Sequence, residues 1–139
     1  MKRVGIGFVC GFIAVLVFHQ GMLAVLNAVG MTEARPFPTT ATEPFGVPQI
    51  WSAAFWGGVW GVVFAWVERY FPRGAGYWLA ALAFGAFALT LVAMLVVRPL
   101  KGQPLAAGGA TALMVGLLLN GAWGVGTALL LRAAARART

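Results

Sequence analysis

Four long apolar segments alternate with short polar ones along the chain. The apolar segments cover residues of about 4–29, 50–67, 77–97 and 110–131. An α-helix needs roughly 20 residues, and as few as about 17, to cross a hydrocarbon layer about 30 Å thick. We therefore expect an all-α integral membrane protein, a four-transmembrane-helix bundle that forms a single membrane domain over residues 1–139.

The polar connections support this division. Residues 31–49 contain four prolines separated by threonine, glutamate and arginine, and a proline cannot donate a backbone hydrogen bond in a helix. Residues 98–104 form a second connection, which includes Pro99 and Pro104. Irregular backbone is not tolerated in contact with lipid, so we expect both segments to be loops outside the hydrocarbon.

The amino-acid composition also indicates a lipid environment. Hydrophobic residues make up 61% of the chain and charged residues 9%, which lies outside the range of ordinary soluble domains. In a soluble protein, a net charge of +7 would suggest binding to nucleic acid. Here the basic residues flank apolar segments instead of forming a patch, so we expect the lipid bilayer as partner and no nucleic acid.

The basic residues predict an orientation, because an even number of spans places both termini on one side. If the termini are inside, seven basic residues lie on the inner face and three on the outer face. The inner set is Lys2, Arg3, Arg69, Arg73, Arg132, Arg136 and Arg138, and the outer set is Arg35, Arg98 and Lys101. The positive-inside rule then predicts cytoplasmic termini in a bacterial inner membrane, with 31–49 and 98–104 as outer loops.

Basic residues at the ends of two apolar segments each allow a second interpretation. Lys2 and Arg3 before an apolar run also suit a signal peptide, but the run is longer than such peptides need, so we expect a retained helix. Arg98 and Lys101 suit snorkelling or headgroup contacts; docking of an anionic partner is the more specific alternative.

The second and fourth segments resemble each other at an offset of 63 residues. Residues 58–62 (GVWGV) match residues 121–125 (GAWGV), and Ala65 and Arg69 match Ala128 and Arg132. The matched helices run in the same direction, so the pattern suggests a parallel duplication of a two-helix hairpin. The alternative is coincidence between two segments that are both rich in glycine and alanine.

Small residues recur every four positions in the same two segments. They are Ala53, Gly57, Gly61 and Ala65 in the second, and Gly116, Asn120, Gly124 and Ala128 in the fourth. In lipid, small side chains allow the close backbone approach that drives helix association. We expect these stripes to be packing surfaces and the two helices to form the bundle centre. Gly7 with Gly11, and Ala81 with Gly85, are weaker instances of the same spacing.

The candidates for a polar site within the apolar segments are His19, Gln20, Thr90 and Asn120. Such residues are costly in lipid and mark a functional site by default. One interpretation is that they form interhelical hydrogen bonds, with His19 as a neutral partner. The other is that His19 titrates or binds a ligand, which would suit a small channel or carrier.

The sequence contains no pattern of a known catalytic site. It has no HExxH motif, phosphate loop or Ser-His-Asp set, and Cys10, the single cysteine, cannot form an intramolecular disulfide. One histidine and three acidic residues do not make a usual metal-ligand set. We therefore expect no enzymatic activity, cofactor or metal.

Five short segments resemble those of small four-helix bacterial membrane proteins of unknown function. They are FHQG (18–21), PFGVP (44–48), FWGGVWG (55–61), PLKGQP (99–104) and NGAWG (120–124). The resemblance supports the four-helix topology and implies no activity. We expect a non-enzymatic accessory or interaction protein that binds a membrane-protein partner or a second copy of itself. The alternative is a channel or carrier with a polar site at His19, Thr90 and Asn120.

Overall fold

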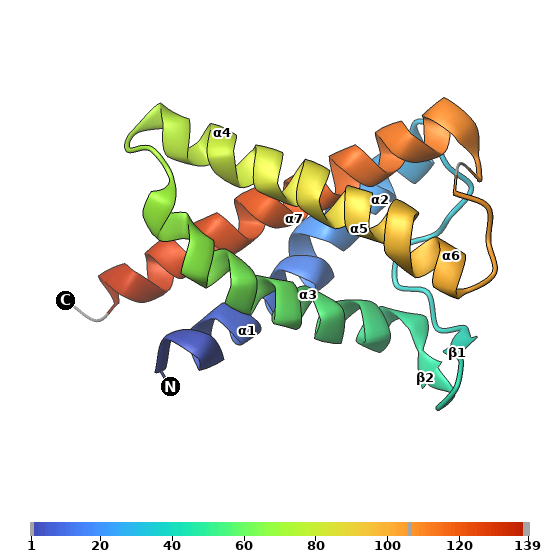
Figure 1. Ribbon diagram of the computed structural model, residues 1–139, viewed down its shortest axis with the longest axis horizontal. Coiled ribbons are helices and arrows are strands. Elements are labelled where there is room, and N and C mark those ends of the chain that lie inside the picture. The colour runs from blue at the N-terminus through green and yellow to red at the C-terminus, as the bar shows by residue number, and fades with distance from the viewer. Residues whose placement is uncertain (1, 106, 138–139) are drawn as a thin grey trace.

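A computed structural model describes residues 2–105 and 107–137. The chain is all-helical with four long helices, apart from one short hairpin (Figure 1). The helices span Lys2–Ala28, Gln49–Tyr70, Ala75–Leu100 and Gly109–Arg136, and each is long and apolar enough to cross a membrane. The expected fold class is confirmed to this extent.

Two of the four helices contain π-helical turns. The first consists of α1 (Lys2–Ala14), the π-helical η1 (Val15–His19) and α2 (Gln20–Ala28). The third consists of α4 (Ala75–Ala83), π-helical η3 (Phe84–Leu89), α5 (Thr90–Val92), π-helical η4 (Ala93–Val97) and α6 (Arg98–Leu100). The second is α3 (Gln49–Val67), which ends in the 3-10 turn η2 (Glu68–Tyr70), and the fourth is α7 (Gly109–Arg136). π-turns occur at functional sites more often than elsewhere; here η1 ends at His19 and η3 ends directly before Thr90.

The third and fourth helices are longer than the sequence indicated. The third continues through Leu100, so part of the loop expected at 98–104 is helical. Pro99 lies in the last turn of this continuous helix, directly after the π-helical η4, so its missing N–H removes one helical hydrogen bond close to the helix end. The fourth continues past Leu131 to Arg136, because alanine and arginine are strong helix formers. Arg138 lies outside the described residues.

The helices pack as two hairpins that meet along α1 and α7. In one hairpin α1 packs along α3, and in the other α4 and η3 pack along α7. α7 also contacts α1 and η1, whereas α3 and α7 meet at few positions. The expectation that the second and fourth helices together form the centre is therefore wrong for α3. Its glycines face α1 instead.

The connection after α2 is ordered by side-chain contacts. The amide nitrogen of Asn27 donates to the carbonyl oxygens of Thr32 and Ala34, at 3.2 and 3.1 Å. A two-stranded antiparallel hairpin then pairs β1 (Ala41–Thr42) with β2 (Val47–Pro48), immediately before α3. Both termini lie at the opposite end of the bundle from this hairpin (Figure 1). We call these the loop end and the terminal end.

Candidate functional site

The first hairpin is held by glycines on both helices. A β-carbon on Gly11 would lie 2.7 Å from the Cα of Gly61 and would also meet the carbonyl oxygen of Gly57. One on Gly61 would lie 2.8 Å from the Cα of Gly11. Real β-carbons do not come this close to backbone, so α1 and α3 touch only because these positions lack side chains.

The second hairpin repeats this arrangement. A β-carbon on Gly85 would lie 2.9 Å from the Cα of Gly124 and would meet the carbonyl oxygen of Asn120. Gly85 thus has the neighbours of Gly11, with Asn120 in the place of Gly57 and Gly124 in the place of Gly61. A further pair agrees, because Gly58 lies against the ring of Phe8 as Gly121 lies against the side chain of Leu82.

The remaining small residues of the two stripes are distributed along these contacts. Ala65 and Ala128 are fully buried, with 0% exposure, and Ala53 is partly buried. Gly116 lies against Thr90, because a β-carbon there would be 3.3 Å from the Cγ2 of that threonine.

Trp123 joins the hairpins. Its indole N–H donates to the carbonyl oxygen of Gly11 at 3.0 Å, and its side chain is 1% exposed. The ring packs edge-on against Phe64 of α3, with the centroids 6.1 Å apart. The matching residue, Trp60, reaches the third helix through its ring alone, which packs edge-on against Phe84. Each tryptophan therefore crosses from its own hairpin to the other.

Thr90 and Asn120 form one polar pair. The side-chain amide of Asn120 donates to the hydroxyl of Thr90 at 2.9 Å, and Thr90 is 2% exposed. The bond joins α5 to α7 one turn from the close contact of Gly85 with α7. This amide occupies the position at which the first hairpin has Gly57.

Gln20 is bound by the loop that follows its own helix. Its side chain is 2% exposed, and its carbonyl oxygen accepts a hydrogen bond from the backbone N–H of Phe37 at 2.7 Å. Its amide nitrogen lies 3.4 Å from Nδ1 of His19, which is partly buried. Pro38 next accepts from the N–H of Ile50 at the start of α3. The loop therefore folds back along α2, and among the described residues no hydrogen bond joins this group to Thr90 and Asn120.

A polar cluster at the terminal end takes one residue from each helix. Glu68 accepts a hydrogen bond from the hydroxyl of Tyr77 at 2.9 Å and pairs with Arg3 at 3.5 Å. Arg3 also donates to the carbonyl oxygen of Ala65, and the Arg132 guanidinium stacks over the Tyr77 ring at 4.1 Å. Sequence reasoning missed this cluster, although Glu68 is the only acidic residue within the four helical spans.

Sequence reasoning also did not identify Thr127. It is 0% exposed, and its hydroxyl has no hydrogen-bond partner among the described residues. It lies on α7 between Gly126, which packs against the ring of Phe18, and the buried Ala128. Nothing in its spacing separates it from an ordinary core position.

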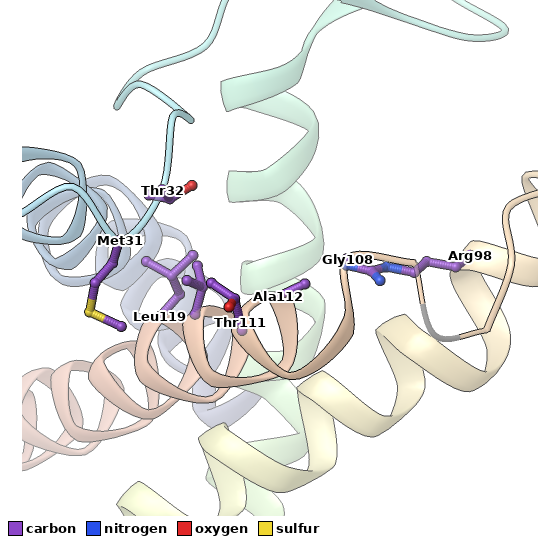
Figure 2. A pocket seen from close by; sticks show the side chains of 9 residues that line it. Met31, Thr32, Arg98, Gly108, Thr111, Ala112 and Leu119 are labelled. Carbon is purple, nitrogen blue, oxygen red and sulfur yellow. The ribbon is translucent and has the colours of Figure 1, made fainter.

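A pocket of about 410 Å³ opens at the loop end between α6, α7 and the loop that follows α2. Figure 2 shows the guanidinium of Arg98 reaching from α6 toward Gly108, with the Thr111 hydroxyl further along the same side of α7. Met31, Val115 and Leu119 give an apolar wall, and Gly116 connects the pocket to Thr90. Within the described residues no group of three or more His, Cys, Asp or Glu side chains could hold a metal ion.

Comparison with known proteins gives no relative for this arrangement. No protein-family model matches the chain, and no curated protein or solved structure is significantly similar to it.

Proposed function

We propose that the chain is a multi-pass protein of the bacterial inner membrane, with both termini cytoplasmic, that acts as a non-enzymatic accessory or interaction protein. Its four helices are each long and apolar enough to span a bilayer. Large apolar side chains such as Phe55, Trp56, Leu79 and Phe87 are exposed on the outside of the bundle. Water would oppose that exposure, whereas lipid or a membrane partner would cover it.

The bundle would have arisen by duplication of a hairpin. This is supported by the packing of the first and third helices, which were not part of the sequence match. The first and third helices have little sequence in common, yet Gly11 and Gly85 have equivalent neighbours on α3 and α7. Trp60 and Trp123 make reciprocal crossings.

The observation that carries an interaction role is that three interior polar side chains bond to groups of the bundle itself, whereas the Thr127 hydroxyl has no partner among the described residues. Asn120 bonds to Thr90, Gln20 to Phe37 and Trp123 to Gly11. Each of these three side chains is thus held by a contact within the bundle, as expected of groups that stabilise helix packing. The polar residues then stabilise the bundle, and the surfaces that recognise a partner are its outer faces and loops.

Purification from bacterial membranes in mild detergent tests this role. We expect the chain to be extracted with the membrane fraction and to elute with a stoichiometric membrane protein or as a homo-oligomer. A monomer that recruits no partner and conducts a specific solute in liposomes would contradict the proposal.

The alternative is a small channel or carrier with a polar site at His19, Thr90 and Asn120. One observation favours it: the pocket at the loop end extends to Gly116, beside the pair of Thr90 and Asn120. Liposome flux distinguishes the two. A specific flux that Asn120→Ala and His19→Ala abolish would support the carrier, and Gly5→Ala, at an exposed glycine with no neighbour within 4 Å, is the control.

The orientation has its own test. Single cysteines introduced at Arg73 and Arg35, in a Cys10→Ala background, are labelled from opposite sides of the membrane. We expect a membrane-impermeant maleimide to label residue 35 from outside in intact cells and residue 73 only after permeabilisation. The reverse result would invert the proposed topology.

A further inference from the structure

The pocket at the loop end places one cation above an apolar wall. Arg98 is the only charged residue among those that line it. Its guanidinium is fixed by a 2.6 Å hydrogen bond from Nη1 to the carbonyl oxygen of Ala107. A guanidinium has five N–H donors, so this bond leaves others for a ligand in the pocket.

The rest of the lining divides into a polar rim and an apolar interior. Thr32 and Thr111 supply hydroxyl groups, and Met31, Ala112, Val115 and Leu119 supply apolar surface. Figure 2 shows Arg98 at one end of this set, with Met31 and Leu119 at the other. A ligand that satisfies both ends carries negative charge on one part and hydrocarbon on the other.

We propose that this pocket binds one anionic phospholipid, with its phosphate on Arg98 and Thr111 and an acyl chain along Val115 and Leu119. Arginine recognises phosphate through paired donors. The first turn of α7 lies in the same wall, and its dipole adds attraction for the anion. The inference rests on the proposed membrane location, and it specifies a lipid as the partner at this site.

The neighbouring Lys101 provides a matched control. It is exposed, follows α6 by one residue and is absent from the pocket lining. Both residues attract anionic headgroups through net charge, but only Arg98 lies where a single lipid would be held. A headgroup attracted by general surface charge would respond equally to the loss of either cation.

The experiment is native mass spectrometry of the full chain, after reconstitution in vesicles with equal phosphatidylglycerol and phosphatidylcholine and brief detergent extraction. We expect the wild type to retain one phosphatidylglycerol in preference to phosphatidylcholine. Arg98→Gln should lower that retention about tenfold, the loss of one hydrogen bond to a charged group. Lys101→Gln should retain the lipid as the wild type does, and Arg98→Lys should fall between.

Each other outcome overturns the inference. No headgroup preference in the wild type, which needs no variant to fold, would exclude a specific site. Equal losses in Arg98→Gln and Lys101→Gln would reduce the effect to surface charge. Displacement of the lipid by glycerol phosphate at equal concentration would assign the pocket to a soluble phosphate ester.

Vesicle flotation of the same samples separates this inference from the proposed function. A chain that does not float with the vesicles contradicts both. A chain that floats but retains no anionic lipid contradicts the lipid site alone.

Discussion

Trp123 donates its indole N–H to the carbonyl oxygen of Gly11, a residue 112 positions earlier in the chain. Gly11 is also one of the points at which the backbone of α1 packs directly on that of α3. One glycine therefore serves two contacts, since its missing side chain admits α3 and its carbonyl binds α7. The link between the hairpins depends on the same backbone that holds the first hairpin together.

Replacement of Trp123 by phenylalanine tests the hydrogen bond while it retains an aromatic ring. We expect the free energy of unfolding, measured by titration with sodium dodecyl sulfate in mixed micelles, to fall by about 1 kcal/mol. Trp60→Phe is the control. The Trp60 ring packs on Phe84, but its side chain makes no hydrogen bond in the part of the chain that the structure describes. Equal losses in the two variants would show that ring size alone matters.

Alanine at Gly11 and at Gly5 should have opposite effects, although both lie on α1. A β-carbon at Gly11 would be 2.7 Å from the Cα of Gly61, whereas one at Gly5 meets nothing within 4 Å. We expect Gly11→Ala to destabilise by about 1–3 kcal/mol through overpacking. Gly5→Ala should stabilise by about 0.5–1 kcal/mol, because alanine loses less backbone entropy.

The larger substitutions Gly61→Leu and Gly124→Leu should prevent folding or assembly, because each side chain would meet the backbone of its partner helix. Size-exclusion chromatography in detergent measures this. If both variants elute and melt as the wild type does, the close contacts are not required.

A double-mutant cycle measures the bond between Asn120 and Thr90. The cycle combines Thr90→Val, which keeps the side-chain shape, with Asn120→Ala. We expect a coupling free energy of about 0.6 kcal/mol, the average for such bonds within membrane bundles. Additive effects of the two substitutions would show that the hydrogen bond makes no net contribution.

Thr127→Val should stabilise the protein, in contrast to Thr90→Val. The hydroxyl of Thr127 is fully buried and has no partner among the described residues, so its removal relieves a desolvation cost of about 1 kcal/mol or more. Thermal unfolding in detergent provides the comparison. A loss of stability at residue 127 would reveal a partner for this hydroxyl, such as a bound water.

Gln20→Leu should release the loop without unfolding the helices. The backbone amide of Phe37 then loses its acceptor, and we expect its hydrogen exchange to quicken by up to about tenfold. His19→Phe is the control, because His19 contacts the amide nitrogen of Gln20 and not the oxygen that binds Phe37. Unchanged exchange in Gln20→Leu would show that the rest of the loop holds residue 37 in place.

Hydrophobic pattern predicted the four helices, because 18 or more apolar residues in a row have few other folds available. Proline content predicted the break before α3. The spacing of Gly57 and Gly61 predicted a face for close approach, but not which helix that face would meet. The partner, α1, carries Gly7 and Gly11, whose spacing alone is common in apolar helices.

Other features depend on contacts that no local pattern encodes. The acceptor of the Trp123 indole is a backbone carbonyl, and the donor to Gln20 is a backbone amide, so neither partner can be recognised by its residue type. The cluster around Glu68 joins four helices whose ends are brought together only by the fold. Pro99 suggests a turn, but the third helix continues through it to Leu100, because a proline in the last turn removes only one helical hydrogen bond.

The bond between Gln20 and Phe37 has a consequence for biosynthesis. Phe37 follows Gln20 by 17 residues, so the ribosome supplies the partner of this amide before α3 has been made. Under the proposed membrane location, the first helix therefore has a partner for the Gln20 side chain before the second hairpin is made. Trp123, by contrast, is made with α7, so this bond between the two hairpins forms only after α7 has been translated.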